Sequence, residues 1–531
     1  MEGRIPFVLR IGVTGHRRME NGPALAPAVR DAVARVRRLV PVSDSTPVVP
    51  VVVSALAEGA DRLVAREILT APGARLEAAL PLPPEDYARD FGSETSAQEF
   101  GELLGRSSEV WQAPESRDRE EAYERAGRHV VDRCDVLIAV WDGRPSSGRG
   151  GTSQIVDYAR ERGVPLVWVP TEGEPRPVEE LEGERAALVA EAGAELERFN
   201  RPSIPHRRAR ANVERELERL GAAAGGAQDP LAREPVARWL LPFFVRADLL
   251  ALRFQSRFKV MSAAIFLMAA AAVGVVAVQT QLFPERTWLV AFEVAALLGV
   301  LAILGLSRRW GLHERWIAYR FLAERIRSLY FLALAGSGHS PDPRGSLAYL
   351  TDPSEVWIER ALTEVMTRLP AAPRDPPVEP LREYLAAHWI GDQARYQGKA
   401  AAEHRARDTW LIRVTAVLFV TTLVASVLHL LGVGGHGEHG STLGAVLVVL
   451  AIVVPVAGAA AHGIGTQRQF RRHSERYRRM AELLGQLHDE MRRARTLGEV
   501  RRAAAETERI IREENSDWFG VMRFHDIELI T

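Results

Sequence analysis

The stretch Val260–Val278, VMSAAIFLMAAAAVGVVAV, carries no charged side chain over its whole length. A helix rises about 1.5 Å per residue, so about 20 apolar residues cross the roughly 30 Å hydrocarbon layer of a bilayer. Three further apolar runs of similar length follow, at Trp288–Leu306, Val414–Leu431 and Leu443–His462. Four such runs predict four membrane-spanning helices, arranged as two hairpins.

Basic residues predict which side of the membrane each helix end faces. The hairpin tips carry only Arg286 in the first case and no Lys or Arg in the second. The positive-inside rule therefore predicts a multi-pass protein of the bacterial inner (cytoplasmic) membrane, with both termini and residues 307–409 in the cytosol. The flanking basic residues are Arg253, Arg257, Lys259, Arg308, Arg309, Arg315, Arg405, Arg407, Arg413, Arg468, Arg471 and Arg472.

Composition limits the classes of protein to which the chain can belong. Lys+Arg and Asp+Glu both number 68, so net charge gives no reason to expect a nucleic-acid partner. Cys134 is the single cysteine, which excludes an intrachain disulfide and fits a reducing cytosol. The N-terminal run Ile5–Val13 is typical of a short strand and not of a signal peptide.

Short β-branched runs alternate with amphipathic stretches before residue 171. This alternation predicts an α/β doubly wound, Rossmann-like domain with a mostly parallel sheet, followed by an α-helical membrane domain with cytosolic helical extensions. Strands are expected at Phe7–Val13, Val48–Ser54, Leu76–Leu80, Glu109–Gln112, Asp135–Trp141 and Pro165–Val169. Helices are expected at Pro23–Leu39, Gly59–Leu69, Arg119–Cys134, Thr152–Arg162, Val178–Phe199 and Ala209–Leu220.

The same patterns predict five regions. They are the α/β domain (1–170), a charged helical linker ending in a flexible connector (171–235), the first hairpin (236–335), a cytosolic connector (336–385) and the second hairpin with C-terminal cytosolic helices (386–531).

The two hairpins share flanking motifs in the same order, which predicts an internal repeat. Arg253-Phe254-Gln255 precedes the first hairpin and Arg395-Tyr396-Gln397 the second. Tyr319-Arg320-Phe321-Leu322-Ala323-Glu324 follows the first and Tyr477-Arg478-Arg479-Met480-Ala481-Glu482 the second, so that an Arg and a Glu four residues apart can pair along each helix. The alternative is a chance match between Arg/Ala-rich helices. A duplicated hairpin favours a pseudo-symmetric four-helix bundle and a homo-oligomer.

Three glycine-containing turns between a strand and a helix are the candidate ligand site. They lie at Ile11–Arg17, Ser54–Asp61 and Trp141–Thr152. The carboxyl ends of parallel strands meet at one edge of a sheet, where backbone amides and helix N-termini bind phosphate oxygens. Each turn alone has the simpler interpretation of an ordinary tight turn, but the three together predict a nucleotide pocket. Its expected residues are Gly12, Thr14, Gly15, His16, Arg17, Ser54, Glu58, Gly59, Asp61, Asp142, Gly150, Gly151 and Thr152.

Residues 5–170 resemble the SLOG superfamily of Rossmann-like domains, through GVTGHR, SALAEGADRL and CDVLIAVWDGRPSSGRGGTSQIVDYA. The resemblance implies a bound nucleotide or nucleotide derivative, with no other cofactor. It departs from the LOG phosphoribohydrolases of that superfamily, because Ile155 stands where their P-G-G-x-G-T-x-x-E pattern has its glutamate. An isoleucine cannot accept a proton, so we expect binding and no catalytic residue. Asp157 and Glu58 remain open as substitutes away from the family spacing.

The hairpins with their trailing Tyr-Arg-x-x-Ala-Glu resemble SLATT modules, membrane effectors associated with SLOG domains and nucleotide cyclases. The resemblance implies that a nucleotide made during phage infection or stress is sensed and the bilayer is then perturbed. A membrane-anchored nucleotide-cleaving enzyme and a scaffold with a degenerate nucleotide domain are the alternatives.

Polar residues near the spans raise separate questions. Glu293 either lines a pore or lies near the interface, since charge at depth costs about 2.5–3.5 kcal/mol. Pro455 should kink the fourth span, and the small residues Gly458–Ala461 should let helices approach closely. His436-Gly437-Glu438-His439 has a spacing that could hold a metal, but a solvated Gly-rich turn is the preferred interpretation, so no metal site is expected.

Overall fold

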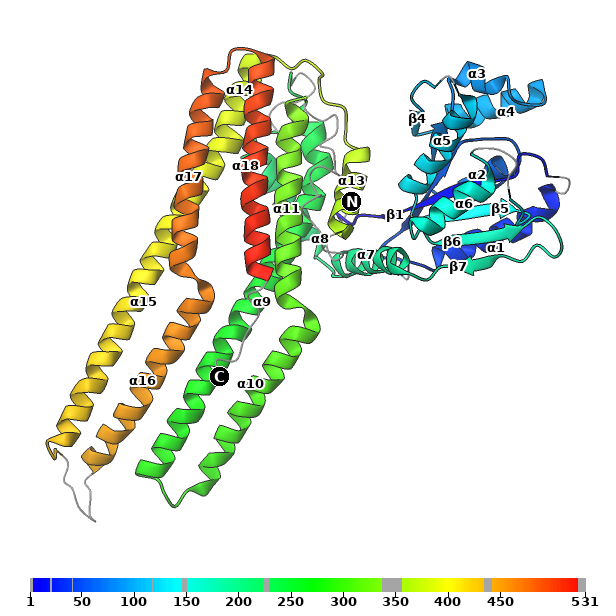
Figure 1. Cartoon of the computed structure of the whole chain (residues 1–531). Helices are drawn as coiled ribbons and strands as arrows, with labels where there is room; N and C mark the ends of the chain where they lie inside the picture. The colour runs from blue at the N-terminus through cyan, green and yellow to red at the C-terminus, as the bar shows by residue number, and fades with distance from the viewer. Residues whose placement is uncertain are drawn as a thin grey trace. The chain divides into compact units, whose positions relative to one another are not determined.

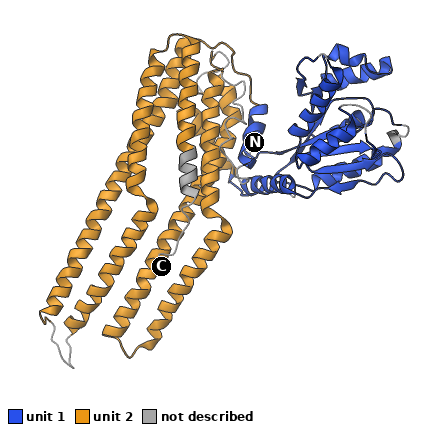
Figure 2. Cartoon of the chain, viewed as in Figure 1, with its two compact units in different colours: residues 1, 3–205, 342–368 blue, residues 2, 206–341, 369–531 orange. Residues whose placement is uncertain are grey.

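The chain forms two compact units in the computed structural model (Figure 2). Apart from its first two residues, unit 1 contains residues 3–205 and 342–368, and unit 2 contains residues 206–341 and 369–531. The structure describes residues 3–19, 22–40, 42–116, 118–145, 150–222, 229–336, 356–433 and 442–523, with residues 22–23 and 516–523 described by their backbone alone.

Unit 1 is built on a seven-stranded sheet in the order β4-β3-β2-β1-β5-β6-β7 (Figure 1). All neighbours pair in parallel except β6 and β7, which are antiparallel. The strand order reverses direction at β1, so right-handed crossovers place helices on both faces of the sheet. The predicted Rossmann-like fold is confirmed. The strands are β1 (Phe7–Gly15), β2 (Val48–Ser54), β3 (Arg75–Leu80), β4 (Glu109–Gln112), β5 (Val136–Trp141), β6 (Leu166–Pro170) and β7 (Val178–Glu180).

The helices of unit 1 follow the prediction where a buried apolar face repeats, and differ elsewhere. The expected helix from Val178 begins only at Glu184, because Val178–Glu180 pair with β6 as an edge strand. Two short helices between β3 and β4 were not predicted. The helices are α1 (Gly22–Arg37), α2 (Ala60–Leu69), α3 (Pro84–Ala88), α4 (Glu94–Gly105), α5 (Arg119–Arg133), α6 (Thr152–Glu161), α7 (Glu184–Asn200) and α13 (Val356–Thr367).

Helix α13 belongs to unit 1 although its neighbours in sequence belong to unit 2. The Arg360 guanidinium donates to both carboxylate oxygens of Asp135, the residue before β5, and Arg75 at the start of β3 pairs with Glu364 at 2.6 Å. Both pairs lie at the amino-terminal ends of parallel strands. Burial alone would raise the pKa of the Asp135 carboxyl, but the Arg360 charge holds it below its ordinary value. Helix α13 is therefore fixed at the sheet edge opposite the predicted ligand turns.

Unit 2 is entirely helical over its described residues. Helix α9 packs against α10, α11 and α16, and α15 packs against α16 and α17, so the two hairpins meet along α9 and α16. Figure 1 shows the α9–α10 and α15–α16 pairs side by side at one end of this unit. Its elements are α8 (His206–Arg219), α9 (Arg233–Leu282), η2 (Thr287–Leu289), α10 (Val290–Trp310), α11 (Leu312–Leu334), α14 (Val378–Tyr384), the π-helix η4 (Leu385–Gly391), α15 (Asp392–Leu430), α16 (Thr442–Arg468), α17 (Phe470–Arg493) and α18 (Leu497–Arg523).

Four helical segments in the described part of the chain are long and apolar enough to cross a membrane, which confirms the predicted number of spans. Only 6–22% of their most apolar windows is buried within the protein, so the remaining surface is available to lipid or to other copies. Helix α16 continues through Pro455. A Cβ on Gly458 would make only ordinary contacts, whereas one on Gly463 would lie 2.5 Å from the Phe266 ring, so Gly463, just beyond the predicted small-residue stretch, is a glycine that the packing requires.

Substitution of Arg360 by Met should loosen α13, because it leaves the buried Asp135 carboxylate without its bidentate partner. We expect the free energy of local opening to fall by about 3 kcal/mol or more. Hydrogen exchange of residues 356–367 in the full-length protein measures this. Arg176→Met is the control, since Arg176 and Glu174 are 79% and 71% exposed and their pair contributes at most about 1 kcal/mol. Unchanged exchange in the Arg360 variant would contradict the docking of α13.

Candidate functional site

Strands β2, β1 and β5 are neighbours, so the three predicted turns do follow strands that end at one sheet edge. Thr14 and Gly15 lie in the last residues of β1, opposite Ala139 and Val140 of β5. Between β1 and β5 the strand order changes direction, which is where ligands of doubly wound sheets bind. The structure thus brings the β1 and β5 turns to the expected position.

His16 connects the first turn to the other two. Its backbone N–H donates to the Val140 carbonyl at 3.1 Å, and its own carbonyl accepts from Ala60 at the start of α2 at 3.0 Å. Its Nε2 lies 3.1 Å from Asp142 Oδ1. The predicted residues His16 and Asp142 therefore touch each other across the β1–β5 boundary, with both side chains partly exposed.

The turn between β2 and α2 is satisfied internally. The Ser54 hydroxyl donates to Asp61 Oδ2 at 2.9 Å, and the Leu56 N–H donates to that hydroxyl at 2.9 Å. Burial raises the pKa of Asp61 to about 6, against the opposing effects of Ser54 and the Arg17 charge. Asp61 therefore has a structural role in this turn.

Glu58 is similarly engaged. Its carboxylate accepts from the Gly92 N–H at 2.9 Å and from the Ser96 hydroxyl. These contacts fix the segment between α3 and α4. Ser54, Glu58 and Asp61 thus hold the turn in place, whereas Thr14, Arg17 and Thr152 lie near the edge with at least part of their surface exposed. His16 is also partly exposed, next to Asp142.

The glycines of this edge are required by contacts between the turns. A Cβ on Gly15 would overlap Ala60 and the Val140 carbonyl, and one on Gly59, where φ is +80°, would overlap the His16 and Arg17 carbonyls. Gly150, with φ +74°, lies against the backbone of Glu124 in α5. Gly12 similarly faces Cys134, whose sulfur would lie 2.7 Å from an added Cβ. Close packing against backbone and side-chain atoms of unit 1 explains these glycines without a phosphate.

The turn between β5 and α6 ends at a helix start. Helix α6 begins at Thr152 with Gly151 as its N-cap, and a glycine has no side chain with which to cap the helix. The Gly150 N–H donates to the Gln154 side chain at 2.8 Å. Residues 146–149, which precede this helix, lie outside the described residues. The N-terminus of a helix is a favourable place for a negative group, because its first backbone amides have no partner within the helix.

Two aromatic residues near Arg17 were not predicted. The Arg17 guanidinium carbon lies 4.5 Å from the centroid of the Tyr123 ring, and the Tyr123 hydroxyl donates to Asp90. Tyr87 of α3 is fully buried, and its ring centroid lies 5.9 Å from that of Tyr123. The Tyr87 hydroxyl has no hydrogen-bond partner in the described part of the chain. The Pro-Pro-Glu-Asp sequence before Tyr87 is a helix-start signal that would have predicted α3.

Ile155 lies in the hydrophobic core of unit 1, 2% exposed, and packs against Gly127 of α5. An acid at this position would be buried among apolar side chains in the present packing. The predicted alternative Asp157 is on the exposed side of α6, 3.8 Å from Arg160.

The repeated motifs of the two hairpins occupy different environments. Arg320 of α11 pairs with the buried Glu324, whereas Arg478 of α17 pairs with Glu482 at 2.7 Å on the exposed surface. Both pairs use the predicted spacing of four residues. Tyr319 is 1% exposed and packs edge-on against Phe254, one residue before Gln255.

The remaining predicted polar residues are accounted for as follows. Glu293 lies in the first turn of α10, half-buried, so it is near a helix end. The His436–His439 segment lies outside the described residues. Among the described residues no group of three or more His, Cys, Asp or Glu could hold a metal ion.

Comparison with known protein families finds a match for the second hairpin. Residues 386–518 match the family described as SMODS and SLOG-associating 2TM effector domain 1, a membrane effector module of the kind found in defence systems. The match covers about a quarter of the chain and supports the predicted resemblance to SLATT modules. No curated protein matches the chain. With the four candidate spans, the match indicates a multi-pass membrane protein.

Gly59→Ala should disrupt the contact between the β1 and β2 turns, because a Cβ there overlaps two carbonyl oxygens. Gly73→Ala is a matched control, since Gly73 has a similar φ of +73° but nothing within 4 Å of an added Cβ. The positive φ costs both variants about 1–2 kcal/mol, and we expect the clash, together with the ψ of −117° at Gly59, to cost Gly59→Ala about 1–3 kcal/mol more. Hydrogen exchange of β1 and α2 measures the difference, and equal effects would contradict the packing role of Gly59.

Proposed function

We propose that this protein is a bacterial membrane effector that binds a nucleotide-type ligand at the carboxyl edge of its sheet and responds by perturbing or permeabilising the membrane. Anti-phage or stress signalling is the setting that the effector family suggests. The observation that carries the proposal is the coexistence in one chain of a Rossmann-like unit and a hairpin that matches a membrane effector domain.

The geometry of the edge supports an anionic, planar ligand. Thr14 and the N-terminus of α6 carry hydrogen-bond donors on either side of the β1–β5 boundary. Arg17 supplies positive charge, and Tyr123 beneath it supplies an aromatic face. Donors for phosphate next to an aromatic surface are the groups that a nucleotide requires.

The position of α13 supports a route by which binding reaches the hairpins. The chain passes from the first hairpin into α13 and from α13 into the second hairpin, while Arg360 and Arg75 hold α13 on the sheet. A ligand shifts a conformational equilibrium only if it binds one state more tightly. Strand β5 connects the α13 contact with the candidate ligand edge, because Asp135 precedes this strand and Asp142 follows it.

The burial of Ile155 in the core supports binding over cleavage. The weak burial of the spans supports association of several copies around a lipid-facing or pore-forming surface. A homo-oligomer would place the hairpins of neighbouring copies against each other.

The test is leakage of an entrapped dye from liposomes that contain the full-length protein. Small molecules that co-purify with the protein are first identified by mass spectrometry, and the nucleotides found are added back. We expect leakage to rise with an active nucleotide, and Arg17→Ala with Thr152→Val to shift its half-effective concentration upward by about 10–100-fold, as the loss of hydrogen bonds to a charged group predicts.

Arg176→Ala is the control for this variant, since Arg176 is exposed and pairs only with Glu174 in the described residues. It should leave the response unchanged. Leakage that is equally fast with and without every nucleotide found would contradict the proposal. Release of a free base by the protein would instead favour the enzyme alternative.

A further inference from the structure

Unit 2 contains a polar cavity of about 340 Å³ next to the ends of the apolar spans, where charged residues such as Lys259 and Arg468 begin. Residues from α9, α11, α15, α16, α17 and α18 line it, so both copies of the repeat contribute. Gln255 and Gln397, the equivalent glutamines of the repeated motifs, both face it. The nucleotide proposal gives this cavity no role.

The cations of the cavity exceed its carboxylates. Two of its arginines are neutralised, because Arg320 pairs with Glu324 and Arg476 pairs with Glu514 at 2.6 Å. The other cationic lining residues are Lys259, Arg407 and Arg468.

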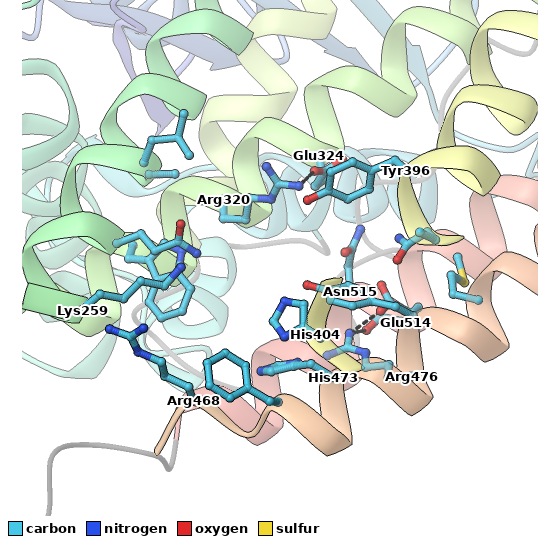
Figure 3. A pocket seen from close by; sticks show the side chains of 18 of the residues that line it. Lys259, Arg320, Glu324, Tyr396, His404, Arg468, His473, Arg476, Glu514 and Asn515 are labelled. Atoms are coloured by element: carbon cyan, nitrogen blue, oxygen red, sulfur yellow. Dashed lines mark hydrogen bonds and ion pairs between the residues drawn. The ribbon is translucent and has the colours of Figure 1, made fainter. Parts of the chain in front are cut away.

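These three cations have little compensation. Arg407 has one distant contact, 3.7 Å from the exposed Glu403. Lys259 and Arg468 have no ion pair with another described residue. Figure 3 shows Lys259 and Arg468 together on one side of the cavity and the Arg320–Glu324 pair on another. Lys259 comes from the first hairpin and Arg468 from the second, so two like charges meet where the hairpins join.

Unsatisfied polar atoms point to an occupant. Gln397 is 8% exposed, and its side-chain oxygen has no hydrogen-bond partner among the described residues. The same is true of Nδ1 of the half-buried His404. A buried polar atom without a partner costs about 1–3 kcal/mol, so such atoms signal a missing ligand or water.

His404 and His473 also line the cavity. His473 lies 5.6 Å from His404, measured between ring centroids. Burial, together with His404 and Arg476, lowers the pKa of His473 to about 4. Its neutral form at pH 7 can donate a hydrogen bond to an anion without adding charge.

We propose that this cavity binds a phosphate ester that also carries hydroxyl groups, with the phosphate between Lys259 and Arg468 and a hydroxyl donating to Gln397. Basic pockets between membrane helices at the cytosolic boundary bind anionic head groups by this chemistry. A bound phosphate would offset the repulsion between Lys259 and Arg468 and tie the two hairpins together. The chemistry fits the head group of phosphatidylglycerol and also a soluble phosphate ester.

The test counts molecules bound to the full-length protein by native mass spectrometry. One arm uses micelles that contain phosphatidylglycerol or phosphatidylcholine, and a second uses glycerol 3-phosphate and AMP. We expect phosphatidylglycerol to be retained at least about tenfold over phosphatidylcholine. Lys259→Gln with Arg468→Gln should remove that preference, and Lys259→Arg should keep it.

Arg471→Gln is the matched control, because Arg471 is close to Arg468 in sequence but 83% exposed and outside the cavity. It should change retention less than about twofold. Binding of AMP or glycerol 3-phosphate that depends on Lys259 and Arg468, without a lipid preference, would identify a soluble ester as the occupant. No binding in either arm, or binding of phosphatidylglycerol and glycerol 3-phosphate that the double substitution leaves unchanged, would overturn the proposal. AMP that remains bound in the double variant is assigned to the sheet edge and not to the cavity, so the two proposals can fail separately.

Discussion

The cost of placing charge in hydrocarbon is the constraint on which the helical unit depends. The four apolar runs contain a single charged residue, Glu293, so the other ionic groups of both hairpins lie beyond the spans. There they must pair with each other or face water. Arg320–Glu324 and Arg476–Glu514 are such pairs, and Lys259 and Arg468 are the cations left over. The polar cavity is a consequence of this segregation.

A different constraint organises the α/β unit. Parallel strands order their backbone turns at one edge, and the turns pack so closely that Gly15 and Gly59 admit no side chain. The amino-terminal edge is occupied by α13 through Arg360 and Asp135. One edge thus carries the candidate ligand groups, and the other holds the segment that continues into both hairpins.

Local sequence predicted what depends on local sequence. The four spans and six of the strands follow from runs and alternation of apolar residues, because burial by lipid or by two helical layers leaves a periodic trace. Ile155 could also be recognised as a departure from a catalytic pattern. β7 could not be predicted, since three exposed residues become a strand only by pairing with β6.

Contacts between residues far apart in the sequence leave no periodic pattern from which they could be predicted. Arg360 and Asp135 are 225 positions apart, so their pairing was not predictable from either neighbourhood. The sequence did predict that the turns after β1 and β5 lie at one sheet edge, because that follows from the parallel order of the strands. The hydrogen bonds that engage the Glu58 and Asp61 carboxylates come from Ser96 and Ser54. The positions of Tyr87 and Tyr123 near Arg17 depend on helices that fold against the turn.

The account rests on the claim that the hairpins cross a bilayer with their charged ends in the cytosol. Labelling of single cysteines in intact spheroplasts with a membrane-impermeant maleimide tests it most directly, in a Cys134→Ser background. Glu285→Cys, at the exposed tip between α9 and α10, should react before lysis. Arg471→Cys, at the start of α17, should react only after lysis. Reaction of Arg471→Cys before lysis, or protection of Glu285→Cys until lysis, would contradict the account.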